Sequence, residues 1–399
     1  MQIKLNREQI SATYDWYRQM RETQPVFFDQ KMQTWHIFRY DDVARLLNDH
    51  ATFSSDESSF LPPEYRNATP ISSSLLRMDP PHHRKLRQLV SQAFTPRMVA
   101  QMEARIQEIT NGLLDQVQHV GEMDVIRDLA VPLPITVIAE LLGIPAERRE
   151  EFKQWSDALV SGEGEETEEE QQALMQTVRR TTDSMAAYFT RLFEERRTHP
   201  QDDLVSALLQ AEVDGERLSQ EELIGFCVLL LVAGNETTTN LIGNTILCLD
   251  DNPGNVERLR ANRNLVPGAL EEALRYYSPV KVTVRGTTTE TTIGEQHIEA
   301  GKLLLVWIAS ADRDEARFPH ADQFLIEREP NRHLGFGRGI HFCLGAPLAR
   351  LEAKIALNAM LDRLPGSWYV PWYVPDAPLS VISSMSVFGV KTLPMTWEK

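Results

Sequence analysis

The sequence predicts a mainly α-helical protein with a minor β component. Three long stretches carry apolar residues at the three- and four-residue spacing of an amphipathic helix. They cover residues 97–120, 171–197 and 218–250. Strand-like segments are fewer and shorter, at residues 35–39, 283–288, 296–298 and 302–307. No linker rich in glycine, serine or proline divides the 399 residues, so we expect a single domain over residues 1–399.

Local signals mark where several elements begin and end. Thr95-Pro96 and residues 219–222 look like helix starts. A hairpin is expected around Gly294, and the tail from Pro365 reads as short strands and turns. The acidic run at residues 162–170 predicts a solvated, mobile connection between two helices.

Composition and charge exclude several classes of protein. Hydrophobic residues make up 42% of the chain, charged residues 25%, and the net charge is −16. This acidic balance argues against a nucleic-acid binder. The N-terminus has no apolar signal-peptide core, and no uncharged apolar stretch reaches the ~18 residues that span a bilayer. We therefore expect a cytoplasmic monomer with no membrane or nucleic-acid partner.

The three cysteines do not form a disulfide framework, because their number is odd in a long chain. Cys227 and Cys248 stand in apolar helical surroundings and are expected to be buried as small hydrophobic residues. Cys343 differs, because it follows a run of alternating glycines in FGRGIHFCLG, residues 336–345.

Two interpretations of this glycine-rich segment fail. A dinucleotide loop needs glycine at its sixth position, where Phe342 stands. A zinc site fits poorly, because no second cysteine lies nearby and His341 is too close to Cys343.

A thiolate-ligated haem fits the segment better. A cysteine that binds iron must be a thiolate, held where amide hydrogens temper its charge. Glycines let the backbone fold tightly around the sulfur, and Gly345 lets a helix over residues 346–364 start close to the macrocycle. That helix directs its positive N-terminal end toward the sulfur, and His341 is placed to meet a haem propionate.

The segment resembles the haem-binding signature of the cytochrome P-450 family, F-G-x-G-x-H-x-C-x-G. Every fixed position is filled, by Phe336, Gly337, Gly339, His341, Cys343 and Gly345. The resemblance implies haem b (iron protoporphyrin IX) and the family's fold, about a dozen helices plus small sheets around a buried haem. The spacing is similar to that of soluble bacterial members, and residues 226–242 and 339–353 resemble broad-substrate Bacillus-type enzymes.

Residues 229–238, LLLVAGNETT, resemble the family's distal helix. By this resemblance Ala233 and Gly234 form the oxygen groove, while Glu236 and Thr237 are the acid and the alcohol that deliver protons. Glycine, asparagine and threonines are poor helix formers, so we expect the helix to be locally opened here.

Three further segments match the family in its usual chain order. Glu272 and Arg275 share a helix face and resemble the structural ion pair behind the haem, with a further partner expected from residues 327–333. His83 and Arg87, four residues apart, and Arg285 resemble the propionate-binding cations. The segment 311–314 departs from the family pattern, because Asp312 replaces an asparagine.

The resemblance implies a monooxygenase that hydroxylates a hydrophobic small molecule: a fatty acid, terpenoid, steroid or macrolide-like compound. Electrons are expected from a ferredoxin or flavodoxin and its reductase, because the chain is filled by the haem domain. Six cations form a candidate basic patch for that donor: Arg84, Lys85, Arg97, Arg338, Arg350 and Lys354. A peroxide-driven peroxygenase and a non-catalytic haem-based binding or sensing protein remain as alternatives.

The substrate pocket is expected to be mostly apolar. Its candidate residues are Phe60, Leu61, Leu75, Leu229, Val232, Ala233, Val280, Lys281, Val282, Val387 and Phe388. The alternative for each apolar residue is an ordinary place in the core. Lys281 would attract a carboxylate, and so favour fatty acids, if it faces the pocket.

Overall fold

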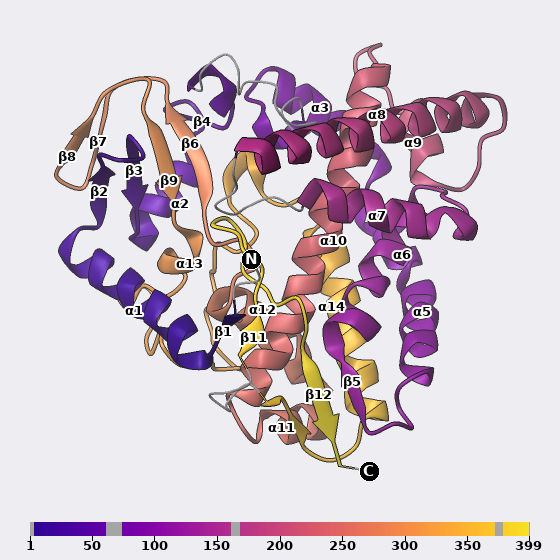
Figure 1. The fold of residues 1–399 in the computed structure, drawn as a ribbon. Helices are drawn as coiled ribbons and strands as arrows, with labels where there is room; N and C mark the ends of the chain where they lie inside the picture. The colour runs from indigo at the N-terminus through magenta and orange to yellow at the C-terminus, as the bar shows by residue number, and fades with distance from the viewer. Residues whose placement is uncertain (1–3, 61–73, 161–167, 372–377, 399) are drawn as a thin grey trace. The chain divides into compact units, whose positions relative to one another are not determined.

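The computed structural model describes residues 4–60, 74–160, 168–371 and 378–398. The chain divides into two compact units, each described here by itself. The first unit comprises Met1–Phe53, Glu103–Leu133 and Thr237–Lys399, and the second comprises Ser54–Met102 and Pro134–Glu236. As predicted, the protein is mainly helical, with small sheets (Figure 1).

The first unit contains the main sheet, in the order β2-β3-β9-β6-β4. These strands are β2 (Val26–Asp29), β3 (Thr34–Ile37), β4 (Phe53–Ser54), β6 (Thr283–Thr287) and β9 (Leu303–Val306). β3 and β9 are parallel, with Ile37 opposite Val306, and β6 runs antiparallel to β9, with Arg285 opposite Leu304. The sheet packs its apolar side chains on α2 (Tyr40–Asn48) and α13 (Ile308–Ala311).

Smaller strands complete the first unit. The hairpin predicted around Gly294 is formed by β7 (Thr291–Ile293) and β8 (Gln296–Ile298), and Gly294 has φ +57°. The tail forms the predicted short strands, where β11 (Leu379–Ser380) pairs with β1 (Lys4–Leu5). β12 (Pro394–Trp397) lies between β10 (Trp368–Tyr369) and β5 (Glu122–Asp124).

The remaining helices of the first unit include those that carry the site. They are α1 (Arg7–Thr23), α5 (Glu103–Asp115), α11 (Asn255–Ala261), α12 (Val266–Tyr276) and α14 (Ala346–Arg363). α12 ends just before Ser278-Pro279, because a residue preceding proline disfavours the helical conformation. α14 agrees with the helix predicted over residues 346–364.

The second unit is helical. It contains α3 (His82–Ala93), α4 (Pro96–Gln101), most of α6 (Pro132–Leu141), α7 (Arg149–Val160), α8 (Glu168–Thr198) and α9 (Leu204–Gln210). Thr95 caps α4 by accepting from Met98 N at 3.2 Å, as the helix start predicted. α8 matches the helix predicted over residues 171–197, whereas most of the acidic run before it lies outside the described residues.

The helix predicted over residues 97–120 is wrong in its extent. It is interrupted at Met102, between α4 and α5, and α5 ends at Asp115. The chain beyond Asp115 tightens into turns such as Val120 N to Val117 O, 2.9 Å, and Gly121 then adopts φ +90°. A residue in this left-handed conformation ends helical periodicity.

α10 (Gln220–Asp250) runs from the second unit into the first as a continuous α-helix, so the expected local opening is not observed. Its polar side chains bond to other elements instead: Asn235 donates to Ser156 Oγ at 3.0 Å and Thr239 donates to Ala130 O at 2.8 Å. α10 is long and apolar enough to cross a membrane, but its most apolar window is 50% buried, and buried core helices pass the same test.

Candidate functional site

The Cys343 loop is held by its own backbone. Cys343 N donates to Phe336 O at 2.9 Å, and Gly337 N donates to Leu334 O at 2.7 Å. The turn Gly339–His341 brings the chain back, and Cys343 is left half-buried. The other two cysteines, Cys227 and Cys248, are fully buried as predicted, and burial raises the pKa of both thiols. Only Cys343 therefore has surroundings suited to a thiolate among the three cysteines.

Gly339 is required by the loop geometry. Its φ is +70°, and a Cβ there would lie 2.8 Å from the carbonyl oxygen of Leu47. Both the left-handed backbone and this contact exclude a side chain without movement of α2 or the loop.

We expect Gly339→Ala to lower the free energy of unfolding by about 2 kcal/mol or more, because a left-handed alanine costs ~1–2 kcal/mol before any clash. Gly301→Ala is the matched control, since Gly301 has φ +80° and a Cβ there meets open space among the described residues. Denaturant unfolding of both variants measures the difference, and equal losses would contradict the role of the Leu47 contact.

The loop fits a large group bound at the sulfur. Gly345 has φ −80°, and a Cβ there would lie 4.0 Å from Cys343 Sγ, so its own backbone tolerates a side chain. A glycine at this position instead leaves space beside the sulfur. Cys343 also directly precedes α14, whose N-terminal peptide dipoles stabilise a negative charge. Space and positive potential at a cysteine sulfur are what a thiolate-ligated metal group needs.

The candidate propionate-binding residues lie in both units. In the first unit, His341 is half-buried in the loop, and Arg285 is 7% exposed on β6, where it donates to Val284 O at 2.7 Å. In the second unit, His83 is buried and Arg87 half-buried, four residues apart on α3. Cationic and hydrogen-bonding side chains of these types recognise carboxylates.

The candidate proton-delivery pair lies where α10 passes from one unit to the other. Glu236 and Thr237 are consecutive and half-buried. Ala233 is exposed, whereas a Cβ on Gly234 would collide with Ile138 Cδ1. The close packing of α10 on α6 at this point is therefore a structural reason for glycine at position 234.

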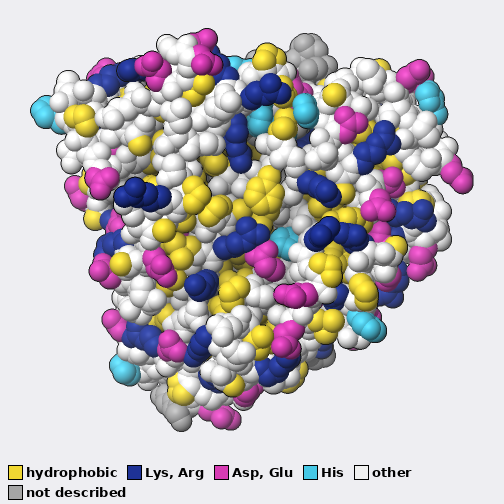
Figure 2. Space-filling view, turned by 180° about the vertical axis from the view of Figure 1, so that it is seen from behind, with side chains coloured by type: hydrophobic (Ala, Val, Ile, Leu, Met, Phe, Trp, Pro, Cys, Tyr) yellow, Lys and Arg dark blue, Asp and Glu magenta, His cyan; other side chains and the backbone are white. Residues whose placement is uncertain are grey.

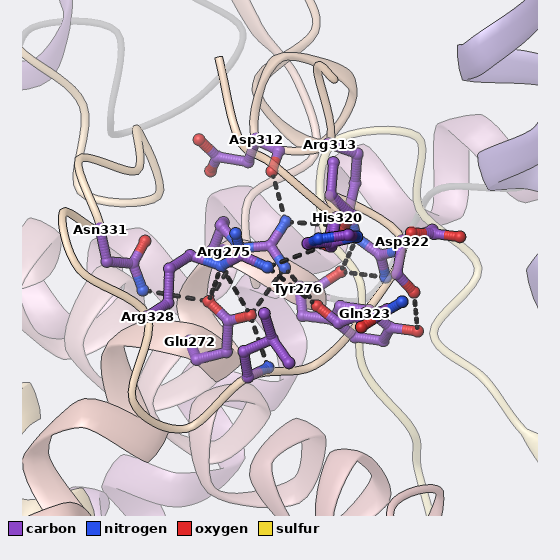
Figure 3. Close-up of polar contacts among 12 residues, drawn as sticks. Glu272, Arg275, Tyr276, Asp312, Arg313, His320, Asp322, Gln323, Arg328 and Asn331 are labelled. Atoms are coloured by element: carbon purple, nitrogen blue, oxygen red, sulfur yellow. Dashed lines mark hydrogen bonds and ion pairs between the residues drawn. The ribbon is translucent and has the colours of Figure 1, made fainter. Parts of the chain in front are cut away.

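The predicted ion pair behind the loop is present and fully buried (Figure 3). Arg275 donates to both oxygens of Glu272, at 2.8 and 2.7 Å. Arg328 and Asn331, which lie in the segment expected to supply a further partner, also donate to Glu272 at 3.0 and 3.1 Å. Arg275 additionally donates to the carbonyl of Asp312 at 2.9 Å, so the network fixes the chain that leads into the Cys343 loop.

Asp312, noted in the sequence only as a departure from a pattern, is a buried acid in this network. Its Oδ1 accepts from Leu334 N at 2.7 Å, at the start of the Cys343 loop. Burial raises the pKa of Asp312 to about 7, although His333, the Leu334 amide, Arg275 and Arg313 all act to lower it.

We expect this acid to make the protein less stable as pH rises from about 4 to 7, because the folded state binds a proton that the unfolded state releases. Asp312→Asn should remove this slope. As pH rises from 4 to 7, its free energy of unfolding should therefore increase relative to that of the native chain by on the order of 2–4 kcal/mol. Denaturant unfolding across that range measures it, with the exposed Asp322→Asn as charge control. An unchanged slope in Asp312→Asn would contradict the assignment.

The candidate pocket residues have mixed surroundings. In the first unit, Val280 forms a β-bridge with Val387, and Lys281 Nζ donates to Ser384 O at 2.6 Å, so the segment before β6 lies beside the tail turn. Val282 instead packs in a core cluster with Tyr17 and Phe38. An ordinary place in the core was the alternative for this residue. Phe388 is buried against Tyr277.

The pocket candidates of the second unit are also partly core residues. Leu75 is buried, while Phe60, Leu229 and Val232 are half-buried. Leu61 lies outside the described residues.

The six candidate patch cations are not equally available. Lys85 pairs with Glu216 in the second unit, and Arg350 pairs with Glu271 in the first. Arg84, Arg97, Arg338 and Lys354 are exposed. On the face shown in Figure 2, Lys and Arg side chains alternate with Asp and Glu around apolar groups.

Comparisons with known proteins agree with the motif. Residues 1–365 match the family described as Cytochrome P450. A putative cytochrome P450, YjiB of Bacillus subtilis, is 43% identical over 387 residues, covering 97% of this chain and 94% of its own. The erythromycin C-12 hydroxylase of Saccharopolyspora erythraea is 40% identical over 356 residues, 88% of this chain and 87% of its own.

A solved structure shows that the likeness extends to the fold. CYP109E1 of Bacillus megaterium in complex with testosterone matches with TM-score 0.86 and 42% identity, over 97% of this chain and 99% of that one. The helices and small sheets described above are therefore those of the P450 fold. The chain belongs to the cytochrome P450 monooxygenase family.

Proposed function

We propose that this monooxygenase binds haem b through Cys343 and hydroxylates a neutral hydrophobic small molecule, with steroids as the first candidates. The observation that carries the proposal is the Cys343 loop. In this loop Cys343 precedes the N-terminus of α14, and Gly345 leaves space beside the sulfur.

Each remaining cofactor residue has a separate task in this proposal. His341 and Arg285 of the first unit, and His83 and Arg87 of the second, bind the haem propionates as hydrogen-bonding cations. Haem iron with a thiolate ligand supplies the activation of molecular oxygen for insertion of one oxygen atom into the substrate. The residues of this chain orient that group and supply protons to it.

Glu236 and Thr237 supply those protons. The Glu236 carboxyl exchanges protons with solvent, and the Thr237 hydroxyl holds a water through which they pass. Their adjacent positions on an unbroken helix keep the two side chains in a constant relation.

The preference for neutral substrates rests on Lys281. Its ammonium donates to the neutral Ser384 carbonyl at 2.6 Å, which holds it beside the tail turn that Val387 joins to Val280. An ammonium held at the Ser384 carbonyl is less available to a fatty-acid carboxylate. The solved relative with testosterone supports a neutral multi-ring substrate, and the relative named as an erythromycin hydroxylase supports a large one.

The proposed donor is a ferredoxin or flavodoxin with its reductase, acting on a cytoplasmic monomer. Product that forms much faster with such a donor than with peroxide alone would separate this proposal from a peroxygenase. Absence of product with either oxidant source would favour the haem-based binding or sensing protein.

Titration of the purified ferric protein tests the substrate class. Testosterone is expected to move the Soret band from low-spin to high-spin, and a long-chain fatty acid is expected to leave it unchanged. Lys281→Met is the matched variant and should keep the steroid response. A strong response to the fatty acid that Lys281→Met abolishes would overturn the preference for neutral substrates.

A further inference from the structure

Glu271 joins the two flanks of the Cys343 loop. Its carboxylate accepts from Arg350 twice, Nε to Oε1 at 2.7 Å and Nη2 to Oε2 at 2.8 Å, and its Oε2 lies 3.0 Å from His333 Nε2. His333 precedes the loop, and Arg350 follows it on α14. The bidentate pair fixes the orientation of the guanidinium as well as its position.

The hydrogen bonds of His333 determine which of its nitrogens carries the proton. His333 Nδ1 accepts from Gly335 N at 3.1 Å, so a neutral ring must carry its hydrogen on Nε2 and donate it to Glu271. Glu271 thereby reaches the backbone of the loop through His333. Burial raises the pKa of Glu271, but the hydrogen bonds from Arg350 and His333 lower it further and hold it at about 2. The carboxylate is therefore charged at neutral pH.

Arg350 extends this connection to the cysteine. Its guanidinium carbon lies 4.4 Å from the centre of the Phe336 ring, and Phe336 O accepts the Cys343 amide at 2.9 Å. The pKa of Arg350 is raised chiefly by its hydrogen bond to Glu271 and further by the charge of the Cys343 thiolate. Arg350 is therefore within electrostatic reach of the sulfur.

We propose that Glu271 is a positioning residue that holds Arg350 and His333 on the Cys343 loop and compensates the charge of Arg350 near the sulfur, which sets the reduction potential of the bound iron. The inference rests on the proposed thiolate ligation by Cys343. It differs from the Glu272–Arg275 network, because the partners of Glu271 touch the loop itself.

Two substitutions are expected to shift the potential in opposite directions. Glu271→Gln removes a negative charge and should make the potential more positive, because the reduced iron carries one positive charge less than the oxidised iron. Arg350→Gln removes a positive charge and should make it more negative. A merely structural role would loosen the loop in both variants and shift both in the same direction.

The experiment is a spectroelectrochemical titration of the haem-loaded native protein and both variants. Asp362→Asn is the control, because Asp362 lies on the same helix as Arg350, α14, and pairs at the surface with Arg263 of another segment, so the potential should stay unchanged. Opposite shifts support the proposal, whereas equal shifts or none in both variants overturn it.

A further variant covers the case in which Glu271→Gln does not take up haem. Arg350→Lys keeps the charge but loses the bidentate pair, and is expected to give a smaller negative shift than Arg350→Gln. Equal shifts in these two would overturn the proposal. Failure of Cys343 ligation itself is recognised separately, because the native protein would then lack a thiolate-type spectrum under carbon monoxide.

Discussion

Arg275→Met is expected to lower the free energy of unfolding by about 3–5 kcal/mol, because it leaves the buried Glu272 carboxylate without its main counter-charge. Both side chains are fully buried, and Arg275 also donates to the carbonyls of Asp312, Ala321 and Gln323. The loss should also reduce haem content, since these carbonyls belong to the chain that leads into the Cys343 loop. Denaturant unfolding and the ratio of Soret to protein absorbance measure the two effects.

An exposed ion pair of the same unit provides the control for that substitution. Arg258 pairs with Glu327 at the surface, and Arg258→Met should cost less than about 1 kcal/mol. Similar losses in the two variants would show that burial of the Glu272–Arg275 pair does not determine its contribution.

Glu236→Gln is expected to lower the rate of product formation by about 10²–10⁴-fold, the range that a positioned general acid contributes. The steroid-induced Soret shift should be retained, since Gln has nearly the same size and only the exchangeable proton is lost. Turnover driven by hydrogen peroxide, which brings its own protons, should be far less affected.

Glu221→Gln, in the first turn of the same helix, is the matched control and should be near native in all three measurements. A Glu236→Gln protein that keeps its rate with the electron donor would remove Glu236 from the proton pathway. Loss of the steroid response instead would assign Glu236 to substrate binding.

The parts of the fold that depend on local patterns were predictable from sequence. The periodic apolar residues of α8 and α10 indicated helices close to those observed, and so did the helix start expected after Gly345 for α14. Polar residues in the middle of α10 predicted an opening that is absent, because bonds such as Thr239 to Ala130 O satisfy them in a closed helix. Such bonds join residues 109 positions apart and leave no local signal in the sequence.

The candidate site divides in the same way. The motif around Cys343 and the spacing of Glu272 and Arg275 are local, so the sequence alone pointed to them. The link from Lys281 to Ser384 spans 103 positions and the link from Glu271 to Arg350 spans 79, and neither has a characteristic spacing. Asp312 was visible as an unusual residue, but only its burial shows that it titrates near neutral pH.

The carbon-monoxide spectrum of the reduced, haem-loaded protein tests the central assignment most directly, when recorded for the native chain and for Cys343→Ser. Thiolate ligation by Cys343 predicts a thiolate-type Soret band in the native protein and its loss in the variant, with Cys248→Ser as the control that keeps it. A thiolate-type band that survives in Cys343→Ser would contradict the account, because the iron ligand would then be another residue.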